Sequence, residues 1–310
     1  MILSMKTNVK INTSMHFSGT ALFAAVLFFM ILLLSACSAG ETAPLPVVED
    51  YMPDPIIEIK DLRVGVVSGP YRDMFTEAII PSLEKKGYTV TFEYYQDYES
   101  PNFALSRNDI DLNVFQHYAY LNTFKFEHDL ALSAIIEIPT VSMSVFSHKI
   151  KTLNDFIPGN FITVPDDASN LARALRVLET ANILTLNPAI DKSKATIADI
   201  ILNPYAVRLM PAPAHDLVDS LDKYEASVIP GNFAVSSGLD LSEALYRETL
   251  TENYKIVIAV RTDDLNKQFV RDIIEIAYSG EFRDAITDPD GKYTNFQWPR
   301  WLHDAMEVAE

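Results

Sequence analysis

Cysteine is nearly absent from this chain of 310 residues, because Cys37 is the single one. A protein with one thiol cannot form an internal disulfide, so its folded state depends on the burial of apolar side chains. Basic residues are also few: 25 lysines and arginines face 42 aspartates and glutamates, which gives a formal net charge of −17. Phosphate backbones repel such an acidic chain, and we expect no nucleic acid among its partners.

The sequence also lacks the short motifs that mark common enzyme and cofactor sites. Neither G-x-S-x-G nor H-E-x-x-H occurs, and the chain contains no phosphate-binding loop or glycine-rich dinucleotide fingerprint. The histidines beyond residue 37 stand far apart without a paired spacing of metal ligands: His117, His128, His148, His215 and His303. We therefore expect no catalytic residue, no cofactor and no metal site.

The first residues have the order of an export signal. Two lysines precede an apolar run over residues 21–34, which is too short to span a bilayer, where about 20 apolar residues are needed. The run ends in Leu-Ser-Ala-Cys37, which resembles the bacterial lipobox, in which the cysteine carries the lipid. A plain transmembrane anchor is the weaker alternative. We predict a signal peptide over 1–36, lipid attachment at Cys37, and an acidic, proline-containing linker over 37–57 that tethers the domain.

Strand and helix periodicities alternate along the rest of the chain. An apolar run over 62–67 leads into a turn, apolar residues at helical spacing follow over 74–83, and Gly87 is placed to end that helix. Further strands are predicted at 90–94, 112–115, 132–136, 143–147, 161–164, 207–210, 226–229 and 254–260, and helices after Ser100, over 171–181 and over 266–279. This order predicts an α/β fold with parallel sheets covered by helices on both faces. About 270 residues exceed one usual core, so we expect two lobes.

One candidate binding segment is Phe115-Gln116-His117-Tyr118-Ala119-Tyr120, where a predicted strand passes into a helix. Parallel α/β folds place ligands at this edge of the sheet. Together with Tyr98, the rings of Phe115, His117 and Tyr120 are able to surround an apolar side chain. The alternative is that Phe115 and Tyr120 are ordinary core aromatics.

A second candidate segment runs from Asp166 to Arg173 and enters the helix predicted over 171–181. Asn170 and Arg173 are three residues apart and share one face of its first turn. A ligand carboxylate there would meet both a bidentate guanidinium and the positive end of the helix. The alternative is a solvated face that Arg173 shares with Arg176.

These segments, in this order after a lipobox, carry a resemblance to a known family. The chain is similar to the methionine-binding lipoproteins, the NlpA family, which serve methionine ABC importers. The likeness runs from about Leu62 to Trp301. Its markers are Arg63-Val64-Gly65-Val66, Ser68-Gly69-Pro70, Leu83-Glu84-Lys85-Lys86-Gly87, Asp97-Tyr98, Pro101-Asn102, Asp109-Ile110-Asp111, Phe115-Gln116-His117, Lys149-Ile150-Lys151, Asn170 with Arg173-Ala174-Leu175, Gly231-Asn232-Phe233-Ala234 and Ile258-Ala259-Val260-Arg261.

The resemblance implies a fold and a set of roles. The fold is that of type II periplasmic binding proteins, in which two doubly wound α/β lobes joined by a two-strand hinge close over one ligand. We expect lobe 1 over 58–141 plus 258–310 and lobe 2 over 142–257. In this family the aromatic residues hold the ligand side chain and the helix arginine takes the carboxylate. By resemblance these roles pass to Tyr98, Phe115, His117, Tyr120 and Arg173.

The chain departs from the family at positions that usually carry a polar partner for the ligand backbone. Pro230 and Ile256 stand where asparagines are typical, and neither side chain forms hydrogen bonds. Asn232, two residues beyond Pro230, is a candidate to compensate. Pro139-Thr140-Val141-Ser142 replaces a His-x-Glu-Pro segment. The hypothesis is a related ligand: methionine, another apolar amino acid, or a short peptide.

The expected function is the capture of a small amino-acid-like ligand outside the cytoplasm for an ABC permease and ATPase complex. The expected location is the cell envelope, with the chain held at the membrane by its N-terminal lipid. The competing hypothesis is a lipoprotein that has kept the fold, lost transport, and acts as an interaction protein. An enzyme is a distant third.

Overall fold

The computed structural model describes residues 60–289 and 291–307. The described residues all belong to one compact unit. The predicted signal peptide, Cys37 and the linker over 37–57 lie outside the described residues. Within the described part of the chain, each helix is too short or too polar to cross a bilayer.

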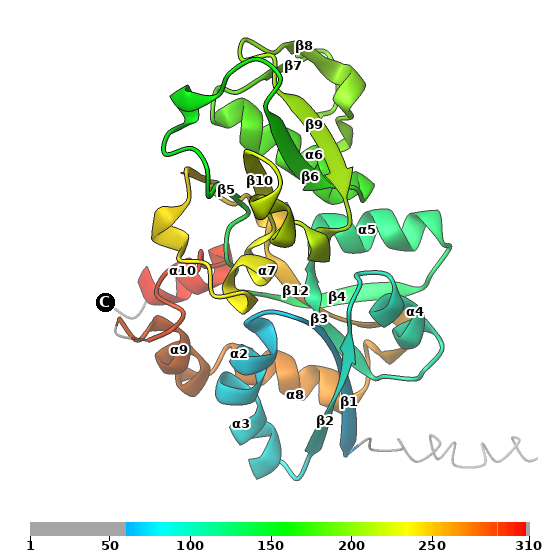
Figure 1. Ribbon diagram of the computed structural model, residues 1–310. Helices are drawn as coiled ribbons and strands as arrows, with labels where there is room; N and C mark the ends of the chain where they lie inside the picture. The colour runs from blue at the N-terminus through cyan, green and yellow to red at the C-terminus, as the bar shows by residue number, and fades with distance from the viewer. Residues whose placement is uncertain (1–59, 290, 308–310) are drawn as a thin grey trace, which may run out of the picture. The chain divides into compact units, whose positions relative to one another are not determined.

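The first of two five-stranded sheets has the strand order β2-β1-β3-β12-β4. Its strands are β1 (Asp61–Val67), β2 (Thr89–Tyr95), β3 (Leu112–His117), β4 (Leu132–Ile138) and β12 (Ile256–Arg261). β1 runs parallel to β2 and β3, whereas β12 runs antiparallel to both β3 and β4. A strand from late in the chain, β12, therefore lies between β3 and β4 in a sheet whose other strands come from the beginning of the described chain (Figure 1).

Helices cover this sheet on both faces and bury its apolar side chains. They are α2 (Tyr71–Ala78), α3 (Ile80–Lys85), α4 (Ser100–Ser106), α5 (Tyr118–Glu127), α8 (Gln268–Ala277), α9 (Gly280–Thr287) and α10 (Arg300–Glu307). The single helix predicted over 74–83 is two helices, and Pro81 in the first turn of α3 explains the break, because proline cannot continue the hydrogen bonds of α2. Gly87 follows α3 with a φ of 86°, as predicted for a helix terminator.

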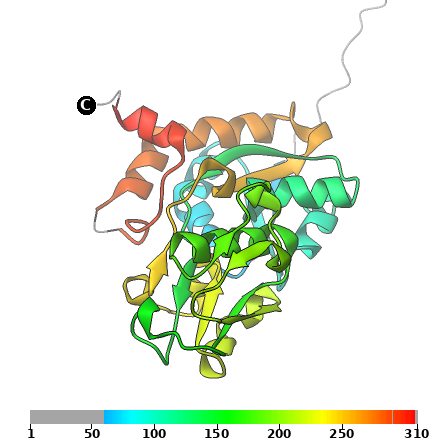
Figure 2. The same ribbon diagram turned by 90° about the horizontal axis from the view of Figure 1, so that it is seen from above.

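The second sheet has the strand order β11-β5-β10-β6-β9. Its strands are β5 (Ser144–Phe146), β6 (Phe161–Pro165), β9 (Arg208–Ala212), β10 (Ala226–Ile229) and β11 (Tyr246–Arg247), and a small pair, β7 (Thr185–Leu186) and β8 (Ile200–Leu202), lies apart from it. The helix α6 (Ala168–Thr180) buries its apolar face in this lobe, and α7 (Gly231–Ser236) follows β10. Figure 2, which looks onto this lobe, shows α8 in orange and α10 in red along the far edge of the first lobe.

The alternation of strands and helices predicted parallel sheets, and both sheets instead mix parallel with antiparallel pairs. β10 is parallel to β6, and β6 to β9, but β5 is antiparallel to β10 and β11 to β5. The antiparallel strands flank the two segments that cross between the sheets, 139–143 and 248–255. The direction of a strand depends on how the chain re-enters the sheet, which the local period of the sequence does not reveal.

The two crossing segments are tied to each other and to the C-terminal part of the chain. Thr140 Oγ1 accepts a hydrogen bond from the Ile256 N–H at 2.7 Å, and Thr140 forms an isolated β-bridge with Gln297. Since β12 already begins at Ile256, this strand starts two residues before the boundary of 258 drawn from the sequence. The lobe limits of 58–141 plus 258–310 and 142–257 stay a prediction.

Candidate functional site

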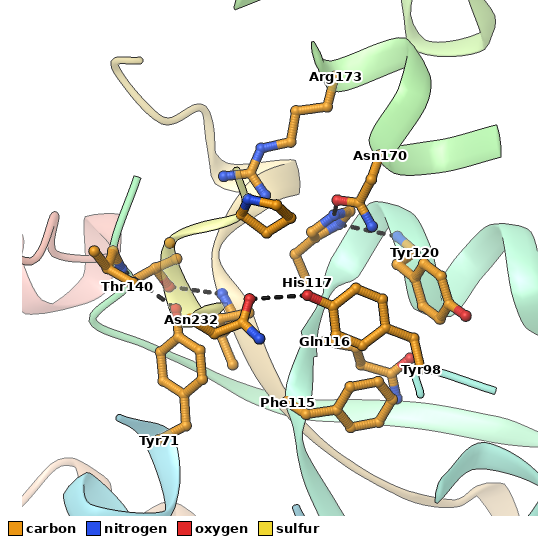
Figure 3. Close-up of a pocket in the computed structure, with 14 residues that line it drawn as sticks. Tyr71, Tyr98, Phe115, Gln116, His117, Tyr120, Thr140, Asn170, Arg173 and Asn232 are labelled. Atoms are coloured by element: carbon orange, nitrogen blue, oxygen red, sulfur yellow. Dashed lines mark hydrogen bonds between the residues drawn. The ribbon is translucent and has the colours of Figure 1, made fainter. Parts of the chain in front are cut away.

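A pocket lies between the two sheets, where the ends of β3, α6, α7 and β12 meet (Figure 3). Seven of its lining residues are the ones selected from the sequence: Tyr98, Phe115, His117, Tyr120, Asn170, Arg173 and Asn232. The others are Tyr71, Gln116, Thr140, Val141, Pro230, Gly231 and Ile256. The fold therefore brings together candidates that are far apart along the chain. Whether each of them binds a ligand stays a prediction.

Aromatic rings form one wall of the pocket. The Tyr98 ring stacks on Phe115 with centroids 5.8 Å apart, meets Tyr120 at 5.7 Å, and lies 5.6 Å from Phe233 of the second lobe. These rings belong to an apolar cluster that also contains side chains from both sheets. Phe115 and Tyr120 therefore belong to the apolar core and also line the pocket. The alternative that they are ordinary core aromatics does not exclude a place in the pocket wall. Such a wall suits an apolar ligand side chain.

His117 ends β3 and caps α5. Its Nδ1 accepts the Tyr120 N–H at 3.0 Å, so the proton of the neutral ring is on Nε2, which donates to Asn170 Oδ1 at 3.0 Å. Burial, together with the nearby charge of Arg173, lowers the pKa of His117 to about 3. A neutral imidazole therefore joins a residue of the first lobe to one of the second.

The start of α6 is already occupied by a side chain of the protein. The Asp167 carboxylate accepts the Asn170 backbone N–H at 2.9 Å and the Asn170 side-chain amide at 3.0 Å. α6 begins at Ala168, three residues before the predicted start, so Arg173 lies in its second turn. Asp167 caps one backbone N–H at the helix end, and Arg173 lies in the second turn rather than the first. The joint action of the guanidinium and the helix end on a ligand carboxylate stays a prediction.

Arg173 is buried rather than solvated, since 4% of it is exposed. Its Nε donates to both oxygens of Glu248, at 2.9 and 3.2 Å, and its Nη2 also donates to Glu248 Oε1. Its guanidinium carbon lies 5.0 Å from the centroid of the Tyr254 ring, whose hydroxyl accepts a bond from Arg176. The alternative of a solvated face shared with Arg176 is therefore wrong for Arg173.

Glu248 is the functional candidate that reasoning from the sequence missed. It follows the short edge strand β11, and a lone glutamate there carries no pattern that distinguishes it from a surface residue. Its Oε1 also accepts the Met143 N–H at 2.8 Å, at the end of the first crossing segment. Glu248 does not line the pocket, so it binds the Arg173 guanidinium on the side away from the pocket.

Asn232 links the lobes through both ends of its amide. Its Oδ1 accepts a hydrogen bond from the Tyr98 hydroxyl at 2.8 Å (Figure 3). Its Nδ2 donates to the Ser68 carbonyl at 3.0 Å. Both bonds engage the amide within the protein, and the compensation for Pro230 by Asn232 stays a prediction. Burial raises the pKa of the Tyr98 hydroxyl, which stays protonated as the donor.

A buried amide network supports the first-lobe wall. Gln116 Nε2 donates to the oxygens of Asn102 and Asn113, at 2.6 and 2.9 Å, and Asn102 Nδ2 donates back to Gln116 at 2.7 Å. Asn102 and Asn113 are fully buried. The network fixes α4 against the end of β3, and with it the segment that carries Tyr98.

No group of three or more His, Cys, Asp or Glu side chains within residues 60–289 and 291–307 is arranged to hold a metal ion.

Comparison with known proteins shows what the chain resembles. It is 34% identical over 71% of its length to "Outer membrane lipoprotein 3" of Mannheimia haemolytica, and covers 83% of that protein. It is 30% identical over 72% of its length to "D-methionine-binding lipoprotein MetQ" of Yersinia pestis, again over 83% of the relative. The solved ABC transporter periplasmic substrate-binding protein from Coxiella burnetii superposes with a TM-score of 0.70 at 30% identity, over 76% of this chain and 99% of that one.

These likenesses confirm the predicted two-lobed binding-protein fold, whose sheets are mixed rather than purely parallel. The family model of the NlpA lipoproteins matches residues 62–301, which include both sheets and the whole pocket. The chain therefore belongs to the NlpA lipoprotein family.

Proposed function

We propose that this chain is the extracytoplasmic substrate-binding lipoprotein of an ABC importer, and that it captures methionine, a related apolar amino acid or a short peptide. The observation that carries the proposal is a buried guanidinium, Arg173, in one pocket with the aromatic wall of Tyr98, Phe115 and Tyr120. Its relatives include a D-methionine-binding lipoprotein and a substrate-binding protein of an ABC transporter.

The pocket offers distinct surfaces to the two ends of an amino acid. In the described part of the chain, the hydrogen bonds of Arg173 use Nε and Nη2, which leaves Nη1 for a ligand carboxylate. The rings receive the apolar side chain. Pro230 and Ile256 line the pocket without a side-chain amide, so the ligand amino group must find other acceptors. This favours a ligand whose backbone is modified or extended, as in a short peptide.

Capture in such a protein needs no chemical step. Contacts made only when both lobes touch the ligand shift the hinge equilibrium toward the closed form, which the permease then recognises. In this proposal Cys37 carries the lipid that holds the chain at the envelope membrane, and the chain has no enzymatic activity.

Mass spectrometry of the compound released on denaturation of the purified protein tests the proposal. We expect a zwitterion or short peptide with an apolar side chain, and isothermal titration calorimetry with that compound should give a single saturable site. Arg173→Ala should weaken this binding by roughly 100-fold, whereas Arg107→Ala, which removes an exposed arginine of the first lobe, should leave it unchanged. Full binding by Arg173→Ala would overturn the proposed site.

A lipoprotein that has lost transport is the second candidate, and the interlobe bonds favour it. Tyr98 with Asn232, Asn232 with Ser68, and His117 with Asn170 hold the lobes together through protein atoms alone. A protein that releases no compound and binds neither amino acids nor peptides would support this candidate over transport.

A further inference from the structure

A second hollow lies at the back of the crossing segments and is separate from the pocket between the lobes. Two consecutive residues of the chain face the two sites: Ile256 lines the central pocket, and Lys255 lines this hollow. Alternation of side chains along an extended chain explains the division. The opposite wall comes from the C-terminal part of the chain and includes Phe296, Trp298 and His303.

The ammonium group of Lys255 has no partner. Only 3% of the residue is exposed, yet no hydrogen bond or ion pair joins its Nζ to any residue in 60–289 or 291–307. A buried charge is ordinarily paired, because desolvation without a partner is unfavourable. Burial lowers the pKa of Lys255, and the carboxylates of Glu252, Glu137 and Glu248 act in the opposite direction.

The charges around Lys255 nearly balance. Arg300 and His303 of α10 line the hollow on its exposed side, and the Arg300 guanidinium is 81% exposed. Glu252 also lines it and accepts the Arg300 backbone N–H at 3.1 Å, while Glu137 faces Lys255 from β4. The two carboxylates lie beyond ion-pair distance of Lys255, and they oppose the entry of a multiply charged anion.

The remaining surface is apolar and aromatic. The Trp298 ring lies 5.3 Å from the His303 ring, and Phe296 and Leu250 are buried beside them. An apolar body packed on these rings would gain contact area while its charged end reaches Lys255.

We propose that this hollow is a second binding site, specific for a small organic monoanion, a carboxylate with an apolar or aromatic body. The unpaired ammonium of Lys255, on a largely buried side chain, supplies the charge partner, and the aromatic wall supplies the contact area. Glu137 and Glu252 select a single negative charge over a double one. The site is independent of what the central pocket binds.

The hollow is built into the hinge. Gln297 lines it, and its side chain accepts the Leu250 N–H at 2.8 Å and donates to Ser142 Oγ at 2.6 Å and to the Glu248 carbonyl at 2.9 Å. These groups belong to both crossing segments. An occupant therefore contacts the residues that join the lobes.

Calorimetric titration of the purified protein with sodium benzoate tests the site, with inorganic phosphate as the dianion. We expect saturable binding of benzoate and much weaker binding of phosphate at pH 8. Lys255→Met keeps the buried stem and removes the charge, and it should weaken benzoate binding by about tenfold or more. Lys194→Met, at an exposed lysine of the second lobe, should leave it unchanged.

Glu252→Gln gives a test of opposite sign. Its amide oxygen still accepts the Arg300 N–H, but one repelling charge is lost, so benzoate should bind about two- to tenfold more tightly. A merely destabilised hinge would not produce tighter binding. Equal benzoate affinity in wild type, Lys255→Met and Glu252→Gln would overturn the proposal, as would phosphate binding that exceeds benzoate binding.

Discussion

The Arg173 guanidinium and the Glu248 carboxylate form a buried pair at the wall of the central pocket, with Nε donating at 2.9 and 3.2 Å. The pair is electrically neutral before any ligand arrives. Glu248 also accepts the Met143 N–H, so the arginine that faces the ligand is held by a residue bonded to the first crossing segment. The position of this guanidinium therefore depends on the hinge as well as on α6.

Loss of the carboxylate should destabilise the protein. Glu248→Gln preserves the side-chain shape and leaves the buried guanidinium without its counter-charge, which typically costs about 3 kcal/mol. Urea denaturation should show this loss in the free energy of unfolding. Glu93→Gln, at an exposed glutamate of β2, should change it by less than about 0.5 kcal/mol. Equal stability of the two variants would mean that the pair contributes nothing.

Removal of the arginine should weaken binding of the released compound, in addition to the stability lost when the buried Glu248 carboxylate has no partner. Arg173→Ala deletes the charge-assisted bond to the ligand carboxylate, and affinity should fall by roughly 100-fold. Arg173→Lys should recover only part of it, because a lysine cannot reproduce the fork that Glu248 holds. Calorimetry with the two variants measures both effects, and full recovery by lysine would argue against the geometry described.

His117 should remain neutral throughout the physiological pH range. Its pKa in the folded protein is about 3, below the ordinary 6.5, so the unfolded chain binds the extra proton first. The contribution of His117 to the free energy of unfolding is fully present above about pH 6.5, and it is lost as the pH falls toward 3. The NMR signals of the His117 ring should not titrate between pH 8 and 5. A midpoint near 6.5 would show that the ring is exposed.

Asn232 should control how firmly the lobes close. Asn232→Ala removes the bonds to both Tyr98 and Ser68, and Tyr98→Phe removes only the first. Small-angle scattering should show the larger radius of gyration for Asn232→Ala and an intermediate change for Tyr98→Phe. Identical scattering from both variants and wild type would mean that these bonds do not hold the closed form.

Ile256 and Pro230 should limit the affinity for free methionine. Ile256→Asn introduces an amide on the pocket wall, where the family typically carries one. Methionine affinity should rise by roughly tenfold, because one more polar group of the ligand is paired. Val257→Asn, which points into the apolar core next to it, should instead destabilise the fold. Unchanged methionine binding by Ile256→Asn would place the missing partner elsewhere.

The pattern of the sequence predicted most strands within two residues, because the period of side-chain burial is a local property. β10 was predicted at its observed limits, Ala226–Ile229. The helix over 74–83 was predicted as one piece, because the helical spacing of apolar residues continues across Pro81. The antiparallel direction of β12 could not be predicted, because direction depends on where the chain returns.

The sequence by itself determined the α/β order of elements and, through residue spacing and a family resemblance, pointed to seven residues that line one pocket. Only the tertiary structure decided which groups pair there. Glu248 lies 75 residues from Arg173, and Asn232 lies 134 residues from Tyr98. Periodicity and motif spacing report neighbours along the chain, whereas the partner of a buried charge is set by how distant segments pack.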